Sequence, residues 1–288
     1  STAPYVGIYY NKEHFTQAGI SRFPETWDEF WTACDKLKAA GHTPISLHLT
    51  ETGWCTMLMA TTYLGRGAEG QAFMKQQFPT NFSTPQIIDM LNMIKRLYTY
   101  TTRDAQGGNY ALAANNFSNE TTSMIPNGPW MIESLSDPSF SAPGFDQKVG
   151  YAKFPEGIMI DNGSEQFGDG VSVDVSKAEQ EAAVEWIRFY ATNEDMIRYT
   201  GRMSGNFSTK VSLTESDKAS FKPPMRIYAE VVPTIKATIP NYQGRWDVLT
   251  QHEVIETEMI NFINGVISAE EMAARMTASA RRYAAENQ

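Results

Sequence analysis

Cysteine and long apolar runs are both scarce in this 288-residue sequence. Cys34 and Cys55 are its two cysteines. Neither stands in a CxxC or Cys/His cluster, so the sequence predicts no disulfide framework and no zinc site, and both thiols are expected to be buried as small hydrophobes. No apolar run approaches the roughly 18 residues that span a bilayer. We therefore expect no membrane-spanning segment in this chain.

Positive charge is also in deficit. The chain has 24 basic against 33 acidic residues, a net charge of −9. This charge repels phosphate backbones and anionic lipid, so nucleic acid is not an expected partner. The remaining composition, 42% hydrophobic and 12% aromatic, is that of a globular protein rather than a disordered one. At about 150 residues per domain, the length suggests two domains.

Catalytic and metal-binding motifs are missing as well. The sequence has no GxSxG, GxxxxGK[ST] or HExxH segment. Its four histidines are dispersed along the chain and are expected to be structural or exposed, and its carboxylates are too numerous for an acid/base pair to be chosen. These patterns predict no catalytic residues, no cofactor and no metal site. The histidines are His14, His42, His48 and His252.

The order of predicted elements indicates an α/β fold. Residues 6–10 and 171–175 are apolar or alternating runs typical of strands. Thr26 with Glu29, and Ser176 with Glu179, are capping-box patterns that open helices. The last third of the chain is helical in pattern. Mixed strands and helices with few hairpin signals predict helices that cover a sheet.

The six tryptophans fall into two groups. Three lie on helix faces among apolar residues and are expected to pack in the core, and three follow turns, near strand ends, where ligands bind in open α/β sheets. An indole presents an apolar face to the C–H side of a sugar ring, while neighbouring polar groups can bind hydroxyls. The core group is Trp27, Trp31 and Trp186, and the turn group is Trp54, Trp130 and Trp246.

Several segments in a fixed order resemble the family 1 extracellular solute-binding proteins, the carbohydrate-capturing receptors of ABC transporters that include the maltose-binding type. These segments are Tyr9-Tyr10-Asn11-Lys12, the run from Pro24 to Phe30, the run from Lys36 to Gly41, and Asn127-Gly128-Pro129-Trp130. Residues 118–123 depart from the small and basic residues usual in the family. The resemblance covers nearly the whole sequence.

The resemblance implies a periplasmic-binding-protein-like type II fold, in which two α/β lobes enclose the ligand. Residues 1–164 and 221–288 would form the second lobe, and residues 165–220 would belong to the first lobe. Most of the first lobe has no counterpart here, so we expect an excerpt that begins at the crossing into the second lobe. Such an excerpt would expose apolar surface over residues 165–220.

The resemblance also implies a function without a catalytic step: capture of a sugar or oligosaccharide between the lobes and delivery to membrane permease subunits. The location would be extracytoplasmic, in the periplasm or lipid-anchored, with the leader absent from this sequence. Two alternatives stay open: a receptor of the same fold for another solute, such as a polyol, peptide or phosphorylated compound, and a carbohydrate-active enzyme. The expected ligand-binding residues are Glu51, Trp54, Trp130, Asp169, Arg245 and Trp246. From the residues alone, Asp169 is equally a turn residue and Arg245 equally a member of a surface ion pair.

Overall fold

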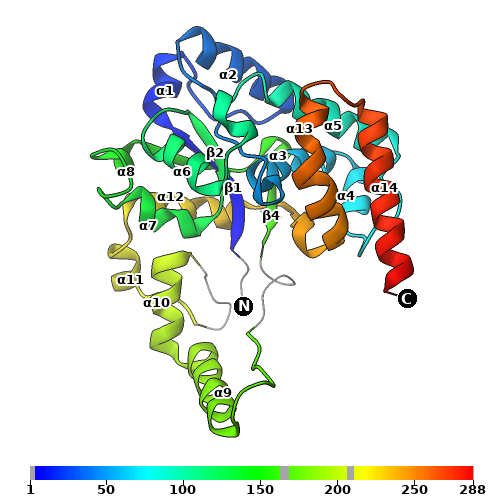
Figure 1. Ribbon diagram of the computed structural model, residues 1–288. Helices are drawn as coiled ribbons and strands as arrows, with labels where there is room; N and C mark the ends of the chain where they lie inside the picture. The colour runs from blue at the N-terminus through cyan, green and yellow to red at the C-terminus, as the bar shows by residue number, and fades with distance from the viewer. Residues whose placement is uncertain (1–3, 163–168, 206–210, 288) are drawn as a thin grey trace.

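The computed structural model describes residues 4–162, 169–205 and 211–287 and has a mixed sheet at its centre (Figure 1). The strand order is β2-β1-β4-β5, and β3 also pairs with β1. β1 is antiparallel to β2, β3 and β4, whereas β4 and β5 are parallel. The strands are β1 Tyr5–Asn11, β2 Met124–Asn127, β3 Val149–Ala152, β4 Ile158–Asp161 and β5 Ala237–Pro240.

β1 holds the sheet together through partners that lie far along the chain. Tyr9 is opposite Ile125 of β2 on one side and Tyr151 of β3 on the other. Five of its seven residues are buried, so both faces of the strand are covered. At Gly7 a Cβ would lie 2.4 Å from the carbonyl oxygen of Ala152, so the close approach of β3 requires glycine there.

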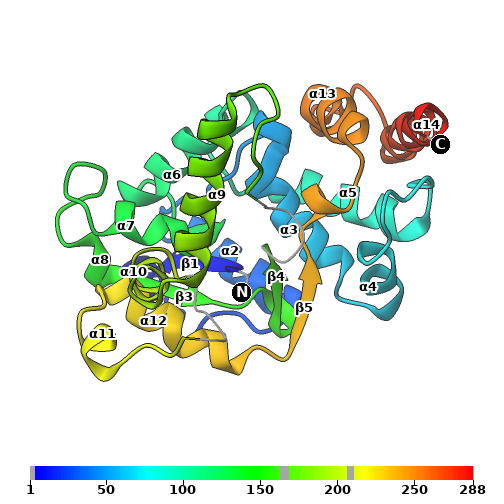
Figure 2. The same ribbon diagram turned by 90° about the horizontal axis from the view of Figure 1, so that it is seen from below.

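Helices cover the sheet, and two of the predicted caps open them. Thr26 accepts a hydrogen bond from the amide of Glu29, and Ser176 and Glu179 form the reciprocal capping box. In both views α13 and α14 lie at the opposite end from α7 and α8 (Figure 2). The α-helices are α1 Lys12–Gln17, α2 Trp27–Ala39, α3 Trp54–Leu64, α4 Ala68–Met74, α5 Pro85–Leu97, α6 Tyr110–Ser118, α7 Ile132–Leu135, α8 Phe145–Lys148, α9 Lys177–Thr192, α10 Glu194–Ser204, α11 Glu215–Ala219, α12 Pro223–Val231, α13 Glu256–Ile263 and α14 Ala269–Glu286.

The segment that leads into α9 and α9 itself correct two expectations. Residues 171–175 form bends rather than a strand, because none of the described strands pairs with them. Trp186, expected in the core, is 60% exposed and packs against Phe189 and Tyr190 of its own helix. No residue of α9 is buried. The exposed apolar surface expected over residues 165–220 is therefore present in their described part.

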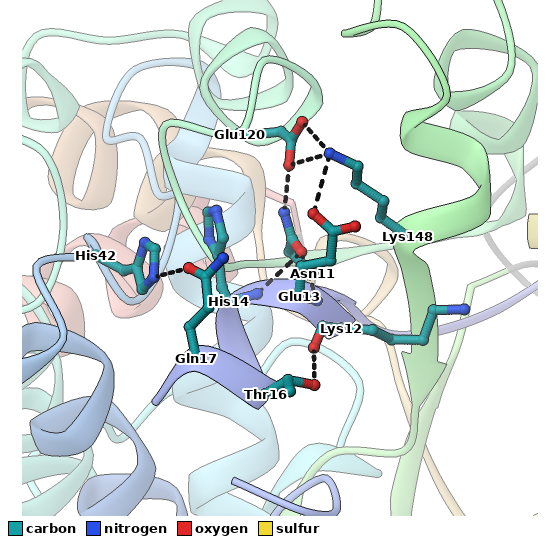
Figure 3. Close-up of polar contacts among 9 residues, drawn as sticks. All are labelled: Asn11, Lys12, Glu13, His14, Thr16, Gln17, His42, Glu120 and Lys148. Carbon is teal, nitrogen blue, oxygen red and sulfur yellow. Dashed lines mark hydrogen bonds and ion pairs between the residues drawn. The ribbon is translucent and has the colours of Figure 1, made fainter. Parts of the chain in front are cut away.

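A polar cluster ties the start of α1 to the turn after α6 and to the end of α8 (Figure 3). The side-chain oxygen of Asn11 caps α1, and its Nδ2 donates to Glu120 at 2.9 Å. Lys148 bridges the carboxylates of Glu120 and Glu13, at 3.0 and 3.1 Å. Glu120 has a left-handed backbone (φ 60°), so the cluster holds a strained turn as well as a helix start.

Two histidines stack beside this cluster, although the sequence separates them. The rings of His14 and His42 have centroids 3.9 Å apart and are nearly parallel. His14 Nδ1 is 3.0 Å from the hydroxyl of Ser123, and His42 Nε2 is 2.8 Å from Oε1 of Gln17. Burial and the neighbouring His42 lower the pKa of His14 further than Glu120 and Glu13 raise it, so the buried ring favours its neutral form.

Candidate functional site

Three aromatic rings from separate parts of the chain converge where α3 and α6 begin. Trp54 opens α3, and its ring lies 5.6 Å from that of Trp130, tilted by 53°. Tyr110 opens α6 and meets Trp54 edge-on at 6.1 Å. All three side chains are half-buried, so each combines packed and exposed surface. We call Trp54, Tyr110 and Trp130 the aromatic cluster.

The turn after β2 sets the direction of Trp130, which lies in the 3-10 turn Pro129–Met131. A Cβ at Gly128 would lie 2.2 Å from the ring of Trp130, so only glycine lets the ring fold back over this turn. Asn127 Nδ2 donates to the hydroxyl of Tyr110 at 3.2 Å, and its Oδ1 accepts from the amide of Gly128 at 2.8 Å. Asn127 thus links the hydroxyl of Tyr110 to the turn that carries Trp130.

Tyr110 is held as a neutral phenol. Burial raises its pKa, and hydrogen bonds from Asn127 and Trp130 offset only part of that rise. A neutral hydroxyl can both donate and accept, which suits recognition of an uncharged hydroxylated ligand. Sequence reasoning missed Tyr110 and Asn127; the N-cap pattern at Asn109, which places an aromatic residue at the start of a helix, was the available signal.

Glu51 belongs to a strained loop that precedes Trp54. Glu51, Thr52 and Gly53 have φ angles of 56°, 62° and 62°, three successive left-handed residues. For the first two, and above all for the β-branched Thr52, this costs about 1–2 kcal/mol each. Glu51 Oε2 accepts from the amide of Tyr110 at 2.8 Å, so its carboxylate holds the start of α6. We call residues 51–53 the left-handed loop.

The left-handed loop is supported from the segment 241–246. The hydroxyl of Tyr242 lies 3.0 Å from Oγ1 of Thr52 and donates to the carbonyl of Thr52 at 3.2 Å. Gln243 Nε2 donates to the same Oγ1 at 3.3 Å. Strain of this kind persists only where surrounding contacts over-determine the backbone, and such outliers gather at functional sites.

Trp246 lies one layer behind this loop, in the core. It is 1% exposed, and its ring meets that of Phe82 at 5.0 Å and 80° and that of Tyr242 at 5.6 Å and 63°. The indole therefore offers no open face to a ligand, in contrast to the expectation from its place after a turn. The turn position was recognisable from sequence, but the direction of the ring was set by packing against Phe82.

The two remaining candidates lie apart from the aromatic cluster in their contacts. Arg245 is half-buried, and its Nη1 is 3.2 Å from Oε1 of Gln77 and 3.4 Å from the carbonyl of Lys75, at the end of α4. Asp169 is exposed in the irregular segment that leads to α9. No contact that we describe brings either side chain to Trp54, so both stay predictions.

The described side chains form no metal site. Over residues 4–162, 169–205 and 211–287, no group of three or more His, Cys, Asp or Glu side chains could hold a metal ion. Cys34 and Cys55 are buried free thiols, and burial raises the pKa of both, which suits the packing role expected of them. Within the described part of the chain, no helix has the length and apolarity to cross a membrane.

The fold is that of a periplasmic-binding-protein-like α/β protein, as expected, because solved structures of sugar-binding proteins share it. The profile described as bacterial extracellular solute-binding protein matches residues 1–197. The chain belongs to this family.

Individual relatives agree with that assignment. The multiple sugar-binding protein of Streptococcus mutans is 29% identical over 210 residues, which are 69% of this chain and 48% of the relative. A chitin oligosaccharide binding protein superposes with a TM-score of 0.79 at 24% identity, over 98% of this chain and 70% of the other. A Streptococcus pneumoniae solute-binding protein in complex with the blood group A-trisaccharide gives 0.75 at 19%, over 96% and 69%. The chain thus spans about half the length of the curated relative, and the solved structures share its fold.

Proposed function

We propose that this chain is the ligand-binding part of an ABC transporter receptor that captures a sugar or oligosaccharide, without a catalytic step. The single observation that carries the proposal is the tilted pair Trp54 and Trp130, half-buried and joined by Tyr110. Indole faces match the apolar faces of pyranose rings, and the polar groups beside them can meet the hydroxyls. The similarity to a multiple sugar-binding protein and to oligosaccharide-binding structures supports this choice.

The chemistry beside the aromatic cluster favours a neutral solute over an anionic one. An anionic ligand is recognised by converging Arg and Lys side chains. Among the described residues, the polar groups at the cluster include the amide of Asn127, the imidazole of His48, which lies edge-on to Tyr110, and, through the backbone of Tyr110, the carboxylate of Glu51. A carboxylate accepts hydrogen bonds from hydroxyl groups and repels phosphate, so a phosphorylated compound is the weaker alternative.

Saturation-transfer NMR with raffinose, maltose and a chitin oligosaccharide, each at millimolar concentration, tests the proposal. This method detects weak binding and reports which sugar protons lie against the protein. We expect saturation to concentrate on ring C–H protons of at least one sugar and to weaken in Trp54→Ala. Absence of transfer to every sugar, with ribitol and a sugar phosphate giving a signal instead, would overturn the sugar assignment.

The lobe division is part of the same proposal. We assign residues 165–220 to the first lobe and residues 1–164 and 221–288 to the second. Support comes from the contrast between the buried sheet strands and α9, on which no residue is buried. The rings of Trp186, Phe189 and Tyr190 suit an interface with further lobe structure. Within this scheme the ligand lies between lobes, and membrane permease subunits receive it outside the cytoplasm.

A further inference from the structure

Two irregular backbone segments face each other next to Trp54. One is the left-handed loop, and the other is a π-helical stretch, Thr250–Ile255, that runs directly into α13. Cγ2 of Ile255 lies 4.0 Å from where a Cβ on Gly53 would stand. π turns are rare and occur frequently at functional sites, and each carries an extra residue that rotates the side chains after it. The first side chain after this stretch is Glu256.

The carboxylate of Glu256 accepts hydrogen bonds from the left-handed loop. Its Oε1 accepts from the amide of Glu51 at 3.1 Å, and the amide of Thr52 donates to the same carboxylate. Its Oε2 lies 2.9 Å from Nδ1 of His252, one turn earlier. Successive amides in turn conformations form a concavity that binds anions, and here a side chain of the protein occupies it.

The charge on Glu256 is favoured at this place. Burial raises its pKa, but hydrogen bonds from His252 and from the amides of Glu51 and Thr52 more than offset burial and hold the pKa below its usual value. The group is 32% exposed, so its contacts are only partly screened by water. An ionised acceptor makes stronger hydrogen bonds to amides than a neutral one does.

We propose that Glu256 is a positioning residue for the aromatic cluster, acting through the left-handed loop. Trp54 follows Gly53 directly, so the backbone that Glu256 holds sets where α3 begins and where the indole points. The same loop carries Glu51, whose carboxylate fixes the start of α6 and with it Tyr110. One carboxylate on α13 thus fixes two of the three rings. This inference rests on the proposed sugar binding at that cluster.

The test compares Glu256→Ala and Glu256→Gln with Glu258→Ala. Glu258 is a matched control because it lies on the same helix and pairs with Arg275 at 2.9 Å, away from the loop. The first readout is the circular-dichroism couplet of the Trp54–Trp130 pair, assigned with Trp54→Phe, which needs no ligand. The second is the dissociation constant for the panel sugar that the parent chain binds, starting with raffinose.

We expect Glu256→Ala to reduce the couplet and to weaken sugar binding about tenfold. Glu256→Gln, which keeps one acceptor oxygen, should lie between Glu256→Ala and the parent, and Glu258→Ala should match the parent. Thr52→Asn should partly restore binding in the Glu256→Ala chain, because asparagine adopts the left-handed conformation more readily than threonine. A purely stabilising role would show no such rescue.

The proposal is overturned if the Glu256→Ala chain folds and keeps both the dichroism couplet and the sugar affinity of the parent chain. This holds whatever the midpoint of its unfolding transition. Should Glu256→Ala fail to fold, Glu256→Gln decides in the same way. If the parent chain binds none of the sugars in the panel, the sugar function is overturned. If Glu256→Ala still loses the couplet in that case, the positioning role of Glu256 is supported. The two failures are therefore distinguishable.

Discussion

Trp54 and Trp130 meet at 5.6 Å because the turn after β2 and the start of α3 lie at the same end of the sheet. Replacing either indole by alanine removes one wall of the aromatic cluster. We expect Trp54→Ala and Trp130→Ala each to weaken sugar binding by about 1–2 kcal/mol, roughly 5- to 30-fold. Saturation-transfer titration measures the change, and Phe140→Ala, which alters a 57% exposed ring elsewhere, serves as the control. Unchanged sugar affinity in both tryptophan variants would contradict the assignment of the aromatic cluster as the sugar site.

Gly128→Ala should move Trp130 without removing it. The new Cβ would stand 2.2 Å from the indole, so the ring has to swing away from Trp54. We expect a shift of the Trp130 indole N–H resonance and a smaller Trp54–Trp130 dichroism couplet. Gly107→Ala is the control, because nothing lies within 4 Å of its Cβ position. An unshifted Trp130 resonance would show that the turn has room for a methyl group.

Trp246→Ala separates packing from ligand binding. The indole is 1% exposed against Phe82 and Tyr242, so its removal leaves a cavity and should lower the free energy of unfolding by about 3–5 kcal/mol. Urea titration followed by far-ultraviolet dichroism measures this loss, and Trp54→Ala, at a half-buried site, should cost less. If Trp246→Ala keeps the stability of the parent chain but loses sugar binding, Trp246 belongs to the ligand site after all.

The stacked pair His14 and His42 predicts lower stability in mild acid. Burial, then His42, lowers the pKa of His14 in the folded chain, so the unfolded chain takes up that proton first as pH falls below about 6.5. The free energy of unfolding should therefore fall as pH drops from there toward the lower folded-state pKa. His48, whose pKa burial also lowers, adds to the effect.

Replacing the titrating ring isolates its share of this pH dependence. His14→Gln should give a flatter plot of unfolding free energy against pH between about 6.5 and 5. Lys12→Ala, an exposed change on the same helix, should keep the parent slope. Denaturant titrations at a series of pH values supply the comparison, and equal slopes in the His14→Gln and parent chains would contradict the expectation.

The exposed rings of α9 predict self-association of this chain. Trp186 and Phe189 are 60% and 46% exposed. Apolar rings that are exposed together on one helix favour association, because contact with another apolar surface removes them from water. We expect concentration-dependent assembly in sedimentation experiments and binding of an apolar dye. The double change Trp186→Glu with Phe189→Glu should reduce both, whereas Phe140→Glu should not. A monomeric, dye-free parent chain would argue against assigning residues 165–220 to a lobe interface.

Local signals in the sequence were sufficient for much of the fold. Thr26 and Ser176 open their helices as predicted, because a cap depends on residues only three positions apart. The segment 171–175 is not a strand, because alternation cannot supply the neighbouring strand that completes a ladder. Local pattern therefore predicts a helix start better than it predicts sheet membership.

The site was predictable only in part. Their places after turns predict a ligand-facing role for Trp54 and Trp130, and the structure brings the two rings together. Trp246 shares that kind of place, but its ring points inward, and no short-range pattern reports the direction in which a ring points. Tyr110 and Glu256 depend on contacts between distant segments, so only the folded chain reveals them.

The pairing of β1 also has a consequence for how the chain reaches this fold. β1 ends at Asn11, yet its first partner strand begins at Met124 and the others at Val149 and Ile158. Closing loops of this length costs chain entropy before any ladder bond forms, and contacts of long sequence separation slow folding. During synthesis, the apolar strand β1 therefore emerges more than a hundred residues before the first of these partner strands, and this delay prolongs the time in which the chain is prone to aggregate.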